Sequence, residues 1–248
     1  MTIVFPMAGL SSRFTKAGYD KPKYMLGVDE STVFFHAVNS FKKYFDECTV
    51  LFIYRDIQNT KEFIDSECIK MKLSNYTSVY LEKETEGQAD TVYQGLVKAN
   101  IKDDEDILIF NIDTFRPNFT LPKELDFNIL DGYLEVFEAE GEHWSFVFPE
   151  NETSNKVIKT TEKERISSLC SSGLYYFKYA KDFLNIFKEI LDKNDRSKNE
   201  FYIAPMYNYM IKENKDIRYS KISLDEIVFC GTPVEYEKII RKYNNAKK

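Results

Sequence analysis

The sequence predicts an α/β fold, a three-layer α/β/α sandwich around a Rossmann-like, mixed and mostly parallel sheet. Two observations support this prediction. Short apolar segments alternate with amphipathic segments through the first half of the chain, which is the order of successive β/α units. The 248 residues are 43% hydrophobic and 15% aromatic, so the chain can bury a sizeable core. We expect residues 1–248 to form one domain, with a first half to about residue 125 and a second half from about residue 126.

The first half reads as apolar strands separated by amphipathic helices. The segment TVLFIY at 49–54 predicts a buried strand, because it is almost continuously apolar and aromatic. The expected strands of this half are 2–5, 49–54, 77–82 and 106–112, and the expected helices are 33–44, 59–71 and 89–99.

The second half begins with short strands broken by turns rich in Gly, Asn and Glu, and ends in helices. This change of pattern predicts an extension of the same sheet rather than further β/α units. The expected strands are 128–137, 144–148, 155–161 and 173–177, and the expected helices are 180–191, 201–211 and 234–243.

Composition excludes several classes of partner. The net charge of −6, with 34 Lys and Arg against 40 Asp and Glu, gives no electrostatic footprint for nucleic acid or an anionic membrane. No apolar run approaches the roughly 20 residues of a spanning helix, and no signal segment begins the chain. We therefore expect a cytoplasmic protein with small-molecule substrates. Widely spaced cysteines and only two histidines favour reduced core thiols over a zinc site; they are Cys48, Cys68, Cys170, Cys230, His36 and His143.

The loop after the first strand carries the strongest functional signal. Its small residues Ala8, Gly9, Ser11 and Ser12 let backbone N–H groups approach phosphate oxygens. Arg13 on this loop, and Lys23 after the proline that follows it, supply the positive charge that a polyphosphate needs. The loop is neither a P-loop nor a dinucleotide-binding GxGxxG turn. An ordinary surface loop is the alternative on residue types alone.

Three further segments carry weaker signals. Asp113 follows the expected strand 106–112, at the end where open α/β sheets bind ligands, although an isolated Asp there often caps a turn. Gly87 lets backbone lie against a ligand and Gln88 offers a donor and an acceptor, but the same residues suit a helix N-terminus. On residue types alone, the charged residues at 162–164 are better explained as a solvated turn, and Glu200 as a negative charge at a helix N-terminus.

Taken in order, these segments resemble the signature of the sugar-phosphate nucleotidyltransferases, a GT-A-like family. The family pattern is a strand, AGxGxRF, a spacer and PKxMLxV, then a GxA segment, an NGD element, an EK pair, TGxYxF and a GTP turn. The matching residues are Ala8, Gly9, Arg13, Phe14, Pro22, Lys23, Met25, Leu26, Gly87, Ala89, Asp113, Glu162, Lys163, Gly173, Tyr175 and Gly231 to Pro233. Four positions depart from the pattern, the first being Ser172, where the family has Thr or Asn. Ser11 stands for a glycine and Ile112 for the glycine of NGD, while Phe229 stands where many members have a second metal-binding Asp.

The resemblance implies a role for each matching residue. Lys23 and Arg13 would be catalytic, and Asp113 would bind Mg²⁺ and contribute to the acceptor side. The nucleotide would be bound by Met7, Ala8, Gly9, Leu10, Ser11, Ser12, Gly87, Gln88 and Ala89. The acceptor would be bound by Glu162, Lys163, Ser172, Gly173 and Glu200 as well as Asp113. In this reading the first half of the domain binds nucleotide and the second half binds acceptor.

The resemblance also implies a reaction. An acceptor phosphate would attack the α-phosphorus of an NTP and release pyrophosphate, with Mg²⁺ as cofactor. The short loop and the FCGTP ending resemble capsule-biosynthesis nucleotidyltransferases of bacteria, which implies CTP and L-glutamine phosphate as substrates and CDP-L-glutamine as product. Three alternatives stay open: a sugar-1-phosphate nucleotidyltransferase, a GT-A glycosyltransferase and an inactive nucleotide-binding module.

Overall fold

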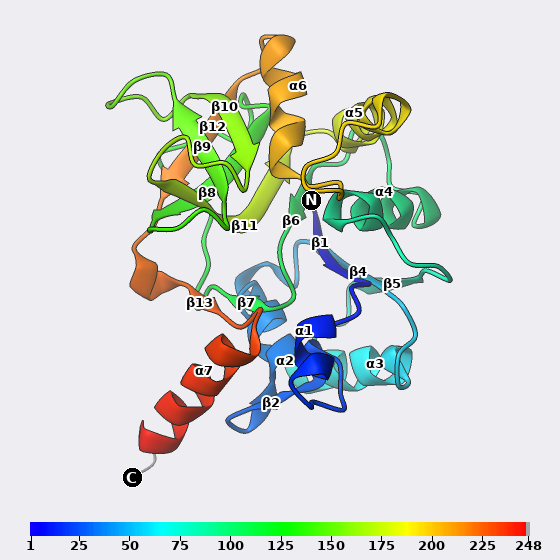
Figure 1. The fold of residues 1–248 in the computed structure, drawn as a ribbon. Helices are drawn as coiled ribbons and strands as arrows, with labels where there is room; N and C mark the ends of the chain where they lie inside the picture. Colours follow the sequence, from blue (N-terminus) through cyan, green and yellow to red (C-terminus); the bar gives the residue numbers. More distant parts are fainter. Residues whose placement is uncertain (247–248) are drawn as a thin grey trace.

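The computed structural model describes residues 1–246 and has the predicted α/β architecture (Figure 1). Its centre is a nine-stranded mixed sheet. The main path of the sheet runs in the order β10 (Val157–Glu162), β9 (Ser145–Pro149), β11 (Leu169–Phe177), β6 (Ile107–Ile109), β1 (Thr2–Met7), β4 (Thr49–Tyr54) and β5 (Tyr76–Tyr80). Two further strands, β8 (Gly132–Glu138) and β12 (Ile217–Lys221), extend from β11.

The first half of the chain forms the parallel part of the sheet. β1 lies between β4 and β6, and β5 adds to the far side of β4, all in parallel register. β1, β4 and β6 are buried on both faces, which explains their nearly continuous apolar sequences, whereas the edge strand β5 is partly exposed. Their carboxyl ends therefore meet at one edge of the sheet, where open α/β folds bind ligands.

The second half joins the same sheet in antiparallel fashion. β11 pairs with β6 and also with β8 and β9, and all of its residues are buried. β8 in turn pairs with β12 in parallel. Because β11 bonds directly to the parallel part, the two halves share one sheet.

Helices cover both faces of the parallel strands (Figure 1). Alternate residues of β1 point to opposite cores. Phe5 packs in the cluster containing α2 (Val33–Asn39) and α3 (Thr60–Met71), and Val4 packs in the cluster containing α4 (Gln88–Lys98) and α5 (Ala180–Lys193). The helices are α1 (Ser12–Lys16), α2 (Val33–Asn39), α3 (Thr60–Met71), α4 (Gln88–Lys98), α5 (Ala180–Lys193), α6 (Tyr207–Lys212) and α7 (Pro233–Ala246). This arrangement gives the three layers that the sequence predicts.

Short elements complete the fold. Single-turn 3₁₀ helices are η1 (Lys23–Met25), η2 (Lys42–Tyr44), η3 (Ala204–Met206) and η4 (Leu224–Glu226). Two small ribbons pair β2 (Gly27–Val28) with β3 (Ser31–Thr32) and β7 (Thr114–Phe115) with β13 (Val228–Phe229). The second ribbon brings the C-terminal segment beside the residue that follows Asp113.

Two expected helices are shorter than the apolar pattern suggests. The helix expected at 33–44 ends at Asn39 and continues only as η2. The helix expected at 201–211 begins at Tyr207, after a 3₁₀ turn at Ala204–Met206, because the Phe201 backbone bonds instead to Glu86 and to Ala89 in α4. The sequence pattern also missed α1, which is too short for a periodic signal, and β12, whose partner β8 lies far away in the chain.

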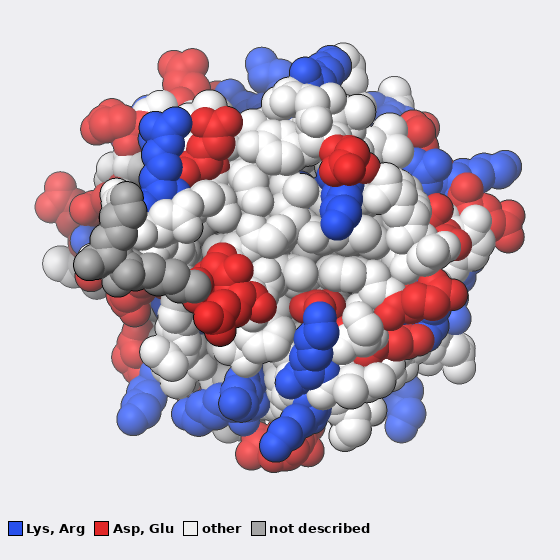
Figure 2. Space-filling view, turned by 90° about the horizontal axis from the view of Figure 1, so that it is seen from below, with Lys and Arg blue, Asp and Glu red and all other residues white. Residues whose placement is uncertain are grey.

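Within residues 1–246, no helix is long and apolar enough to cross a membrane. The face seen from below carries acidic and basic side chains interspersed around uncharged surface (Figure 2). That distribution agrees with the modest net charge of −6.

Candidate active site

Two adjoining cavities, of about 790 Å³ and about 510 Å³, open beside the carboxyl ends of β1 and β6. The first extends toward α4 and the second toward β10 and β11. Eight residues line both cavities and so form their common border: Gly9, Arg13, Lys23, Gln88, Asn111, Asp113, Glu200 and Tyr202. The residues that the sequence predicted as catalytic, Arg13 and Lys23, belong to this border.

The predicted phosphate loop divides between the two cavities. Met7, Ala8 and Leu10 line the first cavity, and Ser11 and Ser12 line the second. The loop can follow this path because Ser11 adopts a left-handed backbone, with φ of 53°, and α1 begins immediately after it.

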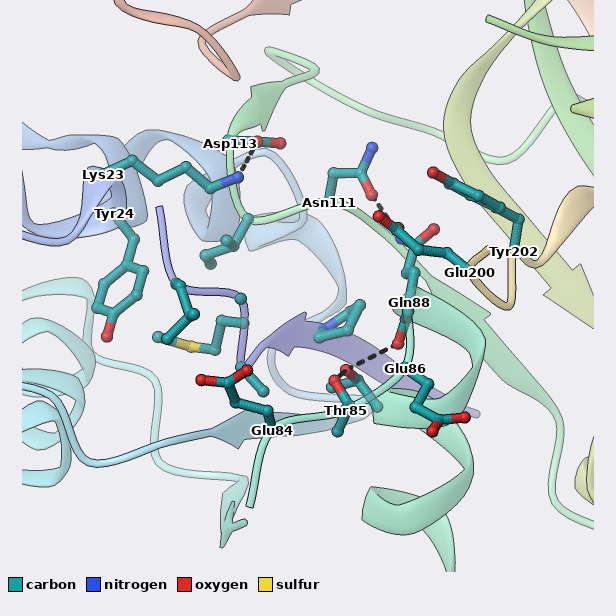
Figure 3. A pocket seen from close by; sticks show the side chains of 18 of the residues that line it. Lys23, Tyr24, Glu84, Thr85, Glu86, Gln88, Asn111, Asp113, Glu200 and Tyr202 are labelled. Carbon is teal, nitrogen blue, oxygen red and sulfur yellow. Dashed lines mark hydrogen bonds and ion pairs between the residues drawn. The ribbon is translucent and has the colours of Figure 1, made fainter. Parts of the chain in front are cut away.

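Lys23 and Asp113 form an ion pair at the common border, with 2.5 Å between Lys23 Nζ and Asp113 Oδ2 (Figure 3). Both side chains are largely enclosed, being 25% and 16% exposed, so solvent screens their attraction only partly. The C-terminal segment fixes Asp113, since Cys230 N–H donates to its carbonyl oxygen. A Cβ at Gly231 would lie 3.1 Å from Asp113 Oδ2, so the glycine leaves room beside this carboxylate.

Gly87 and Gln88 lie at the start of α4, where Gly87 lines the first cavity and Gln88 lines both. Gly87 has φ of +130°, and a Cβ there would lie 2.5 Å from the carbonyl oxygen of Phe201. Only glycine therefore fits this close approach of two backbones. Gln88 Nε2 donates to Asn111 Oδ1 at 2.6 Å, which orients the Gln88 amide at the cavity wall (Figure 3).

Asn111 is in turn held by the predicted acceptor-side segment of β11. A Cβ at Gly173 would lie 2.1 Å from Asn111 Nδ2, and Gly173 has φ of +89°. The glycine thus makes space for the Asn111 amide that contacts Gln88. Ser172 and Gly173 line the second cavity, as does Glu200.

Glu162 lies deep in the second cavity. Its side chain is only 5% exposed, and burial raises its pKa although Ser145 donates a hydrogen bond to it and Lys163 lies nearby. The charge of Glu200 also raises the Glu162 pKa, which places two acidic groups at this end of the cavity.

Two predicted residues lie outside both cavities. Ala89 is buried in the core against the sheet. Lys163 donates from Nζ to the Tyr202 hydroxyl, and its ammonium lies 4.4 Å from the centre of the Tyr202 ring. Burial acts to lower the Lys163 pKa, but the Tyr202 hydrogen bond and the acids around it raise it overall.

Phe229, which stands where many family members have a second metal-binding Asp, belongs to an aromatic cluster. Phe229 packs against Trp144 with ring centroids 5.0 Å apart and against Phe137 at 5.2 Å. Asp225, upstream on the same segment, is exposed and lines neither cavity. Glu235 does line the second cavity, and its Oε2 lies 3.8 Å from the ideal Cβ position of Gly231.

Sequence reasoning missed several lining residues, among them Asn111, Trp144, Tyr202 and Glu235. Asn111 could have been found as the first residue of the NID segment. The others lie on segments that only the fold brings to the cavity.

The arrangement has a definite chemical capacity. Arg13 and Lys23 can neutralise the negative charge of a polyphosphate at the border, and backbone N–H groups of a loop of small residues can approach its oxygens. Asp113 already holds a cation, the Lys23 ammonium, which shows that this carboxylate is placed to bind positive charge.

Comparisons with known proteins agree with this site. No protein-family model and no curated protein matches this chain. Among solved structures, the chain is similar to a nucleoside-diphosphate-sugar pyrophosphorylase from Vibrio cholerae RC9, with 44% identity over 96% of this chain and 99% of that one, and a TM-score of 0.91.

Two more distant structures share the fold alone. A UDP-glucose pyrophosphorylase is 16% identical over 100% of this chain and 99% of that one, with a TM-score of 0.76. An inositol-1-phosphate CTP transferase from T. maritima is 14% identical over 98% and 95%, with a TM-score of 0.68. At 44% identity over nearly its full length, the chain belongs to the nucleoside-diphosphate-sugar pyrophosphorylase family of nucleotidyltransferases.

Proposed function

We propose that this protein transfers a nucleotidyl group from CTP to L-glutamine phosphate, releasing pyrophosphate and forming CDP-L-glutamine for capsule biosynthesis. The observation that supports a transfer reaction best is the common border of the two cavities. Arg13, Lys23 and Asp113 all line it, so groups bound in the two cavities would meet beside the same charged side chains.

The reaction is an in-line displacement. A phosphate oxygen of the acceptor forms a bond to the α-phosphorus of the NTP, and the bond from that phosphorus to the pyrophosphate oxygen breaks. Lys23 and Arg13 stabilise the negative charge on the α-phosphate and the leaving group, and the loop holds the two anions together against their repulsion. This mechanism needs no covalent enzyme intermediate.

Mg²⁺ is the proposed cofactor, and the residues at Asp113 fit it. The carboxylate already attracts a cation, and Gly231 leaves space on its accessible side. When bound, Mg²⁺ would neutralise and orient phosphate oxygens. Phe229 offers no ligand, so Asp113 would share the ion with the nucleotide and water.

The nucleotide would occupy the first cavity, with its base against the Gly87–Gln88 turn. The Gln88 amide donates to Asn111, which leaves its carbonyl oxygen to accept from an exocyclic amino group such as that of cytosine. This supports CTP among the nucleotides.

The acceptor would occupy the second cavity. Its proposed contacts are Glu162, Ser172, Gly173 and Glu200, with Lys163 acting from the rim beside Tyr202. The buried carboxylate of Glu162 suits the ammonium group of an amino-acid phosphate as well as sugar hydroxyls. A sugar 1-phosphate is therefore the second candidate, favoured by the 44% identical pyrophosphorylase.

A turnover matrix tests the proposal. Four NTPs would be combined with L-glutamine phosphate, choline phosphate and several sugar 1-phosphates, with Mg²⁺, and pyrophosphate release would be measured. CTP with L-glutamine phosphate should give the highest kcat/KM. A clear preference for UTP or dTTP with a sugar phosphate would establish the second candidate. Turnover only with a nucleotide-sugar donor would indicate a glycosyltransferase, and no turnover with any pair would contradict transferase activity.

A further inference from the structure

Ser11 adopts a backbone conformation that normally belongs to glycine. Its φ and ψ are 53° and 31°, in the left-handed region that a Cβ disfavours. The family pattern has glycine at this position, where the same conformation carries no steric penalty. A serine here costs about 1 to 2 kcal/mol of backbone strain, as at Lys72 with φ of 58°, and a hydrogen bond of the serine hydroxyl can offset that cost.

The compensating interaction is a hydrogen bond to the catalytic segment. Lys23 N–H donates to Ser11 Oγ, with 3.1 Å between the heavy atoms. Lys23 is the first residue of η1, so its N–H has no partner within that turn. Pro22 precedes it and offers no side-chain cap. The Ser11 hydroxyl therefore caps η1 from a different segment of the chain.

Ser11 also begins α1 through its carbonyl oxygen, which accepts from the N–H groups of Phe14 and Thr15. One residue thus fixes both the loop that carries Arg13 and the turn that carries Lys23. The neighbouring Tyr24 is buried and bonded to Thr60, so the turn as a whole is anchored elsewhere. The Ser11 bond acts on the Lys23 backbone itself.

We propose that Ser11 is a positioning residue, whose hydroxyl fixes the backbone of Lys23 so that the Lys23 ammonium faces the reacting phosphate. This inference rests on the proposed transfer reaction. In the rival role, the hydroxyl would bind a nucleotide phosphate directly, since Ser11 lines the second cavity.

Ser11→Gly separates positioning from stability. Glycine adopts the left-handed backbone more easily than serine, so the midpoint of thermal unfolding should not fall. The same variant loses the bond to Lys23, and kcat should drop about 10- to 100-fold with the KM for nucleotide within about twofold. Ser11→Asn tolerates the left-handed backbone and keeps an acceptor oxygen, and should recover part of kcat.

A second readout does not depend on turnover. Amide hydrogen exchange at Lys23 would be followed by NMR without added substrate. Exchange should be slow in the wild type and faster in Ser11→Gly. The control is Ser66→Ala, which removes an exposed hydroxyl on α3 and should leave exchange at Lys23 slow. If exchange at Lys23 and kcat are both unchanged in Ser11→Gly, the positioning role is wrong. A higher nucleotide KM with unchanged kcat would instead establish direct phosphate binding and overturn it. If the wild type shows no turnover, the transfer reaction fails, and the exchange measurement alone decides whether Ser11 holds Lys23.

Discussion

The ion pair of Lys23 and Asp113 concentrates the charge of the site at the border of the two cavities. Each residue neutralises the other across 2.5 Å. A bound polyphosphate would compete for the lysine, and a metal ion would compete for the carboxylate. The pair is therefore expected to separate when the nucleotide binds.

Lys23→Ala should lower kcat by about 10² or more, because a preorganised charge that stabilises the transition state is lost. Lys21→Ala, which removes an exposed cation two residues away, is the matched control. Steady-state kinetics should show the loss mainly in kcat. A raised KM with unchanged kcat would mean that Lys23 only binds substrate.

Asp113→Asn should abolish most turnover, whereas Asp225→Asn should retain most of it. Asp113 lies at the border of both cavities, and Asp225 is exposed and outside them. Binding of Mn²⁺ to the nucleotide complex, measured by electron paramagnetic resonance, should weaken only in Asp113→Asn. Near-complete loss of activity in Asp225→Asn, with circular dichroism unchanged, would contradict the single-carboxylate site.

Glu162→Gln should make the protein more stable at neutral pH. Burial raises the Glu162 pKa above its ordinary value of 4.5, so the folded chain holds this proton more tightly than the unfolded chain. The free energy of unfolding of the wild type should consequently fall as pH rises from 4.5 through the raised pKa. The variant should lose this slope, which urea unfolding at several pH values would reveal.

Glu164→Gln, an exposed neighbour, serves as the control for that measurement. The slope should persist in this control. If the free energy of unfolding depends on pH in the same way in Glu162→Gln and Glu164→Gln, burial does not raise the pKa of Glu162.

The segment at 196–203 connects the turn before α4 to the wall that the two cavities share. Phe201 N–H donates to the Glu86 carbonyl, and Ala89 N–H donates to the Phe201 carbonyl. Arg196 and Glu86 add an ion pair at 2.5 Å. The turn before α4 and the Glu200–Tyr202 wall of the cavities are consequently built as one unit.

Gly87→Ala should disrupt that unit. The added Cβ would meet the Phe201 backbone at 2.5 Å, and the residue would keep φ of +130°. We expect a loss of about 3 kcal/mol or more in the free energy of unfolding. Gly18→Ala has φ of +89° but nothing within 4 Å of the new Cβ, so it measures backbone strain alone, at about 1 kcal/mol. Equal losses in the two variants would show that the contact with Phe201 contributes nothing.

The two halves of the chain are joined through the sheet and through a buried ion pair. β11 pairs with β6, and Arg116 donates from Nε and Nη2 to the two carboxylate oxygens of Glu135, both at 2.9 Å. Arg116 follows β7 and Glu135 lies on β8, so the pair crosses between the halves. We expect them to unfold together.

Trp144 is the only tryptophan, and it lies in the second half. Its fluorescence and the far-UV circular dichroism should therefore change at the same urea concentration. In a Trp144→Phe, Phe45→Trp variant the reporter moves to the first half, and its fluorescence midpoint should again coincide with the circular dichroism midpoint of the same variant. Two separated transitions would show that the halves are independent domains.

The local sequence predicted most of the fold. Continuous apolar segments marked β4 within its observed bounds, and helix periodicity marked α3 and α4 to within one residue at each end. Such elements can be predicted because their pattern of apolar and polar residues is local in the sequence. The sequence missed β12 and the β7–β13 ribbon, which are defined by partners distant in the chain.

The sequence by itself determined the chemistry available to the site. The small-residue loop, Arg13 and Lys23 were identified from residue types, Asp113 mainly from the family resemblance, and the structure brings them to one border. Only the tertiary structure decided how that chemistry is arranged. In the folded chain Lys163 donates a hydrogen bond to Tyr202, Phe229 packs against Trp144, and the Ser11 hydroxyl accepts a hydrogen bond from the backbone N–H of Lys23. These contacts join segments far apart in the chain or depend on backbone conformation, and neither property can be read from residue spacing alone.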